Sequence, residues 1–315
     1  MNDEQSPPER PPVAAPARSR LLQTSAGTIS DAFGATEWGL LATIAAIWGS
    51  SFLFMAIGLD AFAPGVVTLA RVGLGVSALA LVPRARRPVD RSDLGRIGLL
   101  GLVWVGIPLT LFPIAQQWID SSVAGMLNGA VPLTTALWSV GLLRRLPGRA
   151  QISGILVGFL GVFAISWPQV RDADAEALGT VLVVLAVVLY GLAANMAVPL
   201  QQRYGALPVL LRAQLASLVI VVPVGLWQIP ASTWDWGAAL AMVPLGVLGT
   251  GLAFVAMTTL VGRVGGPRGS IAIYFVPVVA IVLGAVFRSE DIHPLAIAGT
   301  ALVLVGAWLT SRRES

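Results

Sequence analysis

The sequence predicts an all-α polytopic membrane protein with ten transmembrane helices. Two observations lead to this fold class. Of the 315 residues, 56% are hydrophobic and 11% are charged, with a mean hydropathy of +0.81. A soluble domain carries roughly 25% charged residues, so this many apolar side chains must face lipid. The apolar residues also form runs of about 20 residues, the length at which a helix crosses a bilayer.

Each of the ten helices is expected where one of these runs lies. The runs cover approximately residues 38–57, 64–82, 97–117, 121–142, 150–167, 178–199, 207–227, 237–260, 267–287 and 293–311. They are continuously apolar, whereas strands of a transmembrane β-barrel alternate in hydrophobicity. Most connections between runs are short, which favours a compact helical bundle.

Residues 1–37 precede the first run and have a different composition. They are rich in Pro, Ala and charged residues, a composition that cannot bury a core. They lack the apolar stretch of a cleaved signal peptide. We expect a disordered cytoplasmic tail that stays on the mature protein.

The positions of the arginines predict the orientation of the helices. All 20 basic residues are Arg, and cytoplasmic loops of membrane proteins carry an excess of Lys and Arg. A cytoplasmic N-terminus places sixteen arginines inside: Arg10, Arg18, Arg20, Arg84, Arg86, Arg87, Arg91, Arg96, Arg144, Arg145, Arg149, Arg203, Arg263, Arg268, Arg312 and Arg313. The outer loops then hold only Arg171 and Arg288. We therefore expect both termini in the cytoplasm of a bacterium, an inner-membrane location, and no nucleic-acid partner.

An internal repeat is visible when the chain is shifted by 145 residues. The coinciding residues are Gly101 with Gly246, Gly106 with Gly251, Val131-Pro132 with Val276-Pro277, Gly154 with Gly299, and Gly161 with Gly306. At an offset of 142, Trp48-Gly49 lies against Tyr190-Gly191. The two halves, residues 38–167 and 178–311, each contain five expected helices, so the second copy enters the membrane from the opposite side. Inverted repeats build transporters with alternating access to a midplane site.

Two stretches of the sequence resemble a known family. The first is Trp48–Phe52, which reads WGSSF, followed by Pro64 and Arg71. The second is the ending GSIAIYFVPVVAIVLGAVFRSEDIHPLAIAGTALVLVGAWL. Together they resemble EamA-type members of the drug/metabolite transporter superfamily, over roughly residues 38–311. The resemblance implies two inverted EamA repeats, a central cavity, and export or exchange of small metabolites such as amino acids or drug-like compounds.

Polar and aromatic residues inside the expected helices are candidates for substrate binding: Trp48, Ser50, Ser51, Arg71, Asn128, Tyr190, Asn195 and Tyr274. Arg71 is the clearest, since a charge near the bilayer centre costs at least about 2.5–3.5 kcal/mol. It is either a counter-charge for an anionic or zwitterionic substrate, part of an outer gate, or a structural residue that snorkels or caps carbonyls. The uncharged candidates either line a cavity or form hydrogen bonds between helices.

The acidic residues predict the coupling mechanism. All 16 Asp and Glu residues lie in the tail, in loops or at the ends of the expected helices. Proton-driven carriers commonly use an intramembrane carboxylate as a relay. We therefore expect facilitated export or exchange by alternating access, with no cofactor and no metal.

Other classes of function fit the sequence less well. An intramembrane serine protease needs a His base, and the sole histidine, His293, lies at a membrane edge. Metal hydrolases need clustered His, Asp or Glu, which the expected helices lack, so the chain is not expected to be an enzyme. A lipid or lipid-linked carrier or flippase of the same fold remains the alternative, and a non-transporting scaffold is a further one. The expected partners are a small-molecule substrate and membrane lipids, with a monomer and a homodimer both open.

Overall fold

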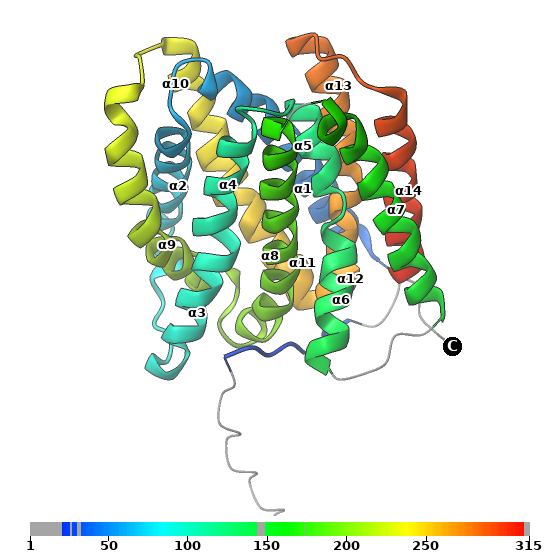
Figure 1. The fold of residues 1–315 in the computed structure, drawn as a ribbon. Coiled ribbons are helices and arrows are strands. Elements are labelled where there is room, and N and C mark those ends of the chain that lie inside the picture. Colours follow the sequence, from blue (N-terminus) through cyan, green and yellow to red (C-terminus); the bar gives the residue numbers. More distant parts are fainter. Residues whose placement is uncertain (1–20, 26, 30–32, 144–148, 173, 312–315) are drawn as a thin grey trace, which may run out of the picture.

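The described part of the chain consists of helices and the turns that join them, with no β-strand (Figure 1). The computed structural model describes residues 21–25, 27–29, 33–143, 149–172 and 174–311. Residues 1–20, 26 and 30–32 of the expected tail lie outside the described residues, as do Arg144, Arg145, Arg312 and Arg313. The all-helical prediction is thereby confirmed for the part of the chain that is described.

The first half of the chain contains helices α1 to α7. Their bounds, with short 3-10 or π-helical elements labelled η, are α1 (Ala35–Leu59), α2 (Pro64–Ala80), η1 (Pro83–Arg86), η2 (Arg91–Asp93), α3 (Leu94–Gly101), η3 (Leu102–Gly106), α4 (Ile107–Ala115), α5 (Ser121–Asn128), α6 (Val131–Leu143) and α7 (Arg149–Asp172). The π-helical η3 joins α3 to α4 in one continuous stretch. Pro108 lies two residues beyond η3, and its missing N–H removes one α-helical hydrogen bond from this region.

The second half contains α8 to α14. The bounds are α8 (Asp174–Tyr204), α9 (Ala206–Gln228), η4 (Ile229–Ala231), α10 (Trp236–Val243), η5 (Pro244–Leu252), α11 (Ala253–Val264), α12 (Gly266–Gly269), η6 (Ser270–Phe275), α13 (Val276–Arg288) and α14 (Pro294–Ser311). The π-helical η5 begins at Pro244 and joins α10 to α11.

Within the described residues, seven helical stretches are long and apolar enough to cross a membrane: Ala35–Leu59, Arg91–Ala115, Ser121–Leu142, Glu176–Tyr204, Ala206–Ala231, Trp236–Val264 and Gly266–Arg288. Three shorter apolar helices, Pro64–Ala80, Ile152–Ile165 and Pro294–Gly306, occupy the other expected positions. Most of these helices extend a few residues beyond the predicted runs, because polar end residues continue the helix where the apolar run stops.

Two further expected helices are divided into shorter elements, as are the two that contain η3 and η5. The run 121–142 is divided between α5 and α6, and the run 267–287 between α12, η6 and α13. Pro132 and Pro277 lie at the second position of α6 and α13, in the first turn, where a residue without an N–H is tolerated. Both helices are 13 residues long and begin 145 residues apart. The repeat offset thus reappears in the helix boundaries.

The helices also pack in reciprocal pairs. Helix α7 packs on α14 and α2 on α9, while α1 contacts α11 as α8 contacts α4. Figure 1 shows α7 and α14 side by side at one edge of the bundle. A Cβ atom at Gly161 would lie 2.6 Å from the Gly299 carbonyl oxygen, and one at Gly299 would lie 2.7 Å from the Gly161 oxygen. The two backbones are in contact, the close packing that associates helices in lipid.

The two ends of the bundle differ in the residues they hold. The tail end, at the bottom of Figure 1, holds the described residues 21–25 and 27–29, the start of α3 and the end of α8. The opposite end holds Asp60 after α1 and Arg288 at the end of α13, which form an ion pair of 2.6 Å.

Candidate functional site

A cavity lies between the helices of both halves, within the described residues. It is lined by Trp48, Ser51, Phe52, Met55, Arg71, Trp104, Leu109, Phe112, Asn128, Val131, Tyr190, Ala194, Phe254, Met257 and Ile273. Its volume is ≈ 40 Å³, which is room for about three water molecules. The walls are mainly aromatic and aliphatic, with a few polar groups, as is typical of small-molecule sites.

Arg71 of α2 supplies the charge of the cavity. The residue is 3% exposed, and its Nε donates to the Thr250 hydroxyl at 3.2 Å. Gln214 of α9 donates to the Thr250 carbonyl at 2.6 Å, so a contact between α9 and η5 supports the position of Thr250. No carboxylate of the described residues forms an ion pair with Arg71. The guanidinium is therefore a buried cation without an anionic partner from the described fold.

Aromatic rings surround the rest of the cavity. The Trp48 indole donates to the Gly249 carbonyl at 3.0 Å and lies edge-on to Phe254, with ring centroids 5.3 Å apart. Phe112 stacks on Tyr190 at 5.8 Å. Such ring pairs have defined relative orientations, so they give the apolar wall a fixed shape.

Residues related by the repeat offsets line this cavity in pairs. At an offset of 142 the pairs are Trp48 with Tyr190 and Phe52 with Ala194, and at 145 they are Leu109 with Phe254, Phe112 with Met257, and Asn128 with Ile273. Five lining residues have no such partner: Ser51, Met55, Arg71, Trp104 and Val131. For Arg71 the equivalent position, 142 residues further on, is Ala213, which lies outside the lining. The cavity is thus built from equivalent positions of both halves, with one charge supplied by the first.

The structure brings five of the eight sequence candidates together at the cavity: Trp48, Ser51, Arg71, Asn128 and Tyr190. Asn128 has a buried side-chain oxygen without a hydrogen-bond partner among the described residues. Such a group carries the full cost of desolvation, and in a cavity wall it is available to a bound molecule.

Three candidates lie outside the lining. The Ser50 hydroxyl donates to the Ile47 carbonyl of its own helix at 3.0 Å. Tyr274 is buried in η6 next to the lining residue Ile273. Asn195 is fully buried one residue beyond Ala194, toward the tail end, and its side-chain amide donates to the Thr135 carbonyl at 2.8 Å.

Four aromatic lining residues were not among the candidates predicted from the sequence: Phe52, Trp104, Phe112 and Phe254. Trp104, Phe112 and Phe254 are apolar residues in apolar helices, and the fold buries them at the cavity. Phe159 is also an apolar residue in an apolar helix, but it is 68% exposed on the outside of the bundle. Composition alone does not separate the two cases. The repeat offset relates Phe112 to Met257 and Phe254 to Leu109, and the fold shows that both members of each pair line the cavity.

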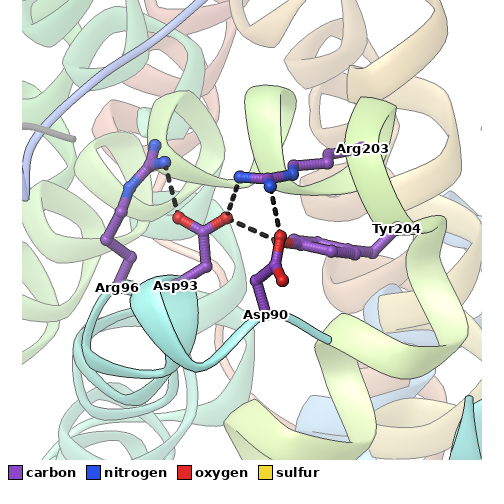
Figure 2. Close-up of polar contacts among 5 residues, drawn as sticks. All are labelled: Asp90, Asp93, Arg96, Arg203 and Tyr204. Atoms are coloured by element: carbon purple, nitrogen blue, oxygen red, sulfur yellow. Dashed lines mark hydrogen bonds and ion pairs between the residues drawn. The ribbon is translucent and has the colours of Figure 1, made fainter. Parts of the chain in front are cut away.

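A second group of charges lies at the tail end (Figure 2). Asp93, at the start of α3, is 1% exposed and accepts hydrogen bonds from Arg96 at 3.1 Å, Arg203 at 2.7 Å and the Tyr204 hydroxyl at 2.7 Å. Arg203 also pairs with Asp90. This tail-end network joins α3 of the first half to α8 of the second.

At the opposite end a polar vestibule of ≈ 610 Å³ opens outward. Asp60 and Arg288 form part of its wall, together with Gln116. Gln116 lies one turn of α4 beyond Phe112, and Met55 and Ala56 of α1 line the cavity and the vestibule respectively. The vestibule is therefore separated from the cavity by about one helical turn.

Comparison with known proteins gives one family and several relatives. Residues 37–167 and 177–312 match the EamA-like transporter family. A probable terminal-alkyne amino-acid exporter of Streptantibioticus cattleyicolor is 30% identical over 285 residues, which cover 88% of this chain and 93% of that protein. An uncharacterized transporter of Archaeoglobus fulgidus is 22% identical, with 88% of this chain and 99% of that protein covered. One solved crystal structure has the same fold, with a TM-score of 0.64 at 18% identity, and the match covers 87% of this chain and 97% of that chain.

These relatives are named as transporters, and none of them is named as an enzyme. They give no support to the alternative of a lipid carrier. The apolar helices and the family match together make the chain a multi-pass membrane protein that takes a small-molecule substrate. With both of its halves matched, the chain belongs to the EamA-like transporter family.

Proposed function

We propose that this transporter exports or exchanges small amino-acid-like zwitterions, or related amphipathic metabolites, by alternating access. The observation that carries the proposal is Arg71, a buried guanidinium in an aromatic-lined cavity with no carboxylate partner among the described residues. A substrate carboxylate supplies the missing charge through the bidentate geometry that guanidinium groups favour. The name of the Streptantibioticus relative agrees with this class of substrate.

The aromatic walls suit the rest of such a substrate. The rings of Trp48, Tyr190 and Phe254 face an apolar side chain or, through their π faces, an ammonium group. The cavity lining contains no carboxylate among the described residues, so the ammonium group has no ionic partner there. This arrangement favours zwitterions with short apolar side chains over dibasic molecules.

The size of the cavity supports alternating access. A volume of ≈ 40 Å³ holds water but no metabolite, so binding requires the surrounding helices to separate. Our proposal is that the helices make ten crossings in two inverted repeats, residues 38–167 and 178–311, which rock about the cavity. The reciprocal helix pairs and the paired lining residues support this arrangement.

We place the tail end in the cytoplasm, with both termini there, in a bacterial inner membrane. The arginines whose contacts lie at the tail end support this, since Arg96, Arg203 and Arg263 form ion pairs there. An excess of arginine marks the cytoplasmic side. The vestibule with Asp60 and Arg288 then faces outward.

The test is transport into proteoliposomes with three radiolabelled probes. L-propargylglycine is an amino acid with a terminal alkyne, L-norvaline is its saturated analogue, and homopropargylamine is the first probe without its carboxylate. We expect uptake of both amino acids and none of the amine, because only the amino acids carry the partner for Arg71. Liposomes with Arg71→Ala protein at equal density serve as the matched control.

Two outcomes contradict the proposal. Uptake of the amine as fast as the amino acids means that the carboxylate is not recognised. A strict requirement for a proton gradient overturns facilitated exchange. We favour facilitated exchange because the described cavity wall has no carboxylate that could carry a proton.

A further inference from the structure

The described residues of the N-terminal segment, 21–25 and 27–29, lie against the tail end of the bundle, and we call them the strap. The Thr24 hydroxyl donates to the Asn195 side-chain oxygen at 3.3 Å, and the Ser25 hydroxyl to the Gln202 side-chain oxygen at 2.8 Å. These contacts fasten the strap to the last turns of α8.

The second part of the strap is held by α11 and α12. The Ile29 amide donates to the Arg263 carbonyl at 2.8 Å, and Arg268 donates to the Ile29 carbonyl at 3.1 Å. The strap therefore contacts three helices of the second half, although the composition of residues 1–37 favours disorder.

Gly27 marks the closest approach of the strap to the bundle. A Cβ atom at this position would lie 2.2 Å from the Val264 carbonyl carbon and 2.4 Å from the Gly265 nitrogen. Both atoms are backbone and cannot rotate away. Gly265 itself has a φ of +86°, which favours glycine at this turn between α11 and α12. Two glycines thus allow the strap and the turn to touch.

The strap contacts the bundle one residue away from the lining of the central cavity. Asn195, which Thr24 contacts, follows the lining residue Ala194, and its amide reaches across to α6 at Thr135. A Cβ atom at Gly266 would lie 3.3 Å from the Asn195 side-chain oxygen and 3.5 Å from Thr135. Asn195, Thr135 and Gly266 thus pack together next to the lining residue Ala194, and Thr24 contacts this group from the tail end.

We propose that the surface formed by the tail ends of α8, α11 and α12 is a binding site for an extended polypeptide segment, and that the chain's own strap occupies it. The docked strap closes the route from the tail end to the cavity, and it leaves before substrate enters from that side. This role in entry rests on the proposed function, whereas docking itself does not.

The chemistry of the contacts is that of a reversible closure. The contacts are hydrogen bonds through hydroxyl and backbone groups, while Leu21 and Leu22 remain exposed. Hydrogen bonds with water replace such contacts at little net cost, and release of the segment recovers its conformational entropy. The two effects oppose each other, which is what a reversible closure requires.

Docking is tested by cysteine labelling, because the natural chain contains no cysteine. Val264→Cys places a thiol beside Gly27, and Ala194→Cys places one in the cavity wall. Each is combined with deletion of residues 2–29, with Gly27→Ala, or with Gly39→Ala as the matched control, since a Cβ at Gly39 meets nothing within 4 Å. A membrane-impermeant maleimide is then applied separately to each face in oriented vesicles.

We expect both thiols to react faster from the tail face after deletion and after Gly27→Ala, with no change for Gly39→Ala. A strap that is docked in about nine of ten molecules predicts a rise of about tenfold. Equal reaction rates of Val264→Cys protein with and without the strap overturn docking. Faster reaction of Val264→Cys but not of Ala194→Cys overturns closure of the route.

A peptide measurement tests the binding site without any transport. The probe is a fluorescent peptide with the sequence of residues 21–29, acetylated and amidated, added to the protein that lacks residues 2–29. We expect saturable binding, which restores slow labelling of Ala194→Cys, and no binding of a Gly27→Val peptide. Equal binding of both peptides overturns the site. Failure of amino-acid uptake with intact peptide binding contradicts only the proposed function.

Discussion

The centre of the bundle and its tail end each bury a charge, but they treat it in opposite ways. Asp93 at the tail end accepts hydrogen bonds from Arg96, Arg203 and Tyr204, so its charge is balanced within the fold (Figure 2). Arg71 at the centre has one hydroxyl contact and no anionic partner among the described residues. A balanced buried charge stabilises one arrangement of helices, whereas an unbalanced one needs a ligand.

The comparison predicts that removing Arg71 affects transport and spares the fold. Arg71→Ala removes a charged hydrogen-bond donor worth about 1.5–3 kcal/mol to a bound carboxylate, so transport efficiency falls by about 10- to 100-fold. The thermal midpoint stays the same or rises, because an uncompensated charge leaves the interior. Initial uptake rates and thermal unfolding of the purified protein measure the two effects.

Arg212→Ala is the matched control for Arg71. Its guanidinium donates to the Ala85 and Pro208 carbonyls at 3.3 Å and 3.1 Å, away from the cavity lining. Transport should persist in this variant. Suppose that uptake by Arg71→Ala protein falls only as much as the amount of folded protein falls. Arg71 would then be a structural residue, and the contrast with Asp93 would be wrong.

Removing the charge of Asp93 is expected to give the reverse pattern. Asp93→Asn weakens the hydrogen bonds of Arg96 and Arg203 in a buried position and costs about 1–3 kcal/mol of stability. The thermal midpoint should fall, while uptake per folded molecule stays near that of the natural protein. Asp90→Asn is the exposed control, since the Asp90 side chain is 58% exposed and exposed ion pairs contribute about 0–1 kcal/mol.

A loss of uptake in fully folded Asp93→Asn protein would sharpen the comparison in another direction. It would make the tail-end network a gate that must form during each transport cycle. Fluorescence-detected unfolding and uptake on the same preparation distinguish this outcome from simple instability.

The sequence predicted the helices well because apolar length and proline positions are local properties. It also singled out Arg71 and Tyr190, which line the cavity, since polar groups in apolar helices face the interior. It missed the pairing of Asp93 with Arg203, which lie 110 residues apart and are both outside or at the ends of the expected spans. It gave no sign of the strap, because the hydrogen bonds of Thr24 and Ile29 depend on partners that only the fold brings together.

The stacked ring of Tyr190 predicts a smaller effect at the cavity. Tyr190→Phe keeps the contact with Phe112, whose centroid lies 5.8 Å away, and loses only the hydroxyl. Under the proposed function this hydroxyl forms a neutral hydrogen bond with the bound substrate. Such a bond contributes about 0.5–1.5 kcal/mol, so we expect KM to rise by about 2- to 10-fold. Tyr190→Ala, which also removes the ring, should weaken uptake further. Equal KM values for the two variants would show that the ring does not shape the site.

The smallest expected effect concerns Asp120, a carboxylate at the opposite end of the bundle. Among the described residues its side chain forms no ion pair, and it does not cap α5. Partial burial and the negative charges of Glu290, Glu176 and Asp291 raise the pKa of Asp120 above its ordinary value. The folded state therefore holds this proton to higher pH than the unfolded state, and stability falls as pH rises through that window.

Asp120→Asn removes the charge and should raise the thermal midpoint slightly at pH 7. The gain should shrink as the pH falls toward about 4, where the ordinary carboxyl takes up its proton. Asp235→Asn is the control, because Asp235 caps α10 through the Ala238 amide at 2.7 Å and offers no such gain. The measurement is the thermal midpoint of each protein from pH 4 to pH 8. A gain that grows at low pH would contradict the prediction. It would mean that the carboxylate of Asp120 stabilises the opposite end, just as the carboxylate of Asp93 stabilises the tail end.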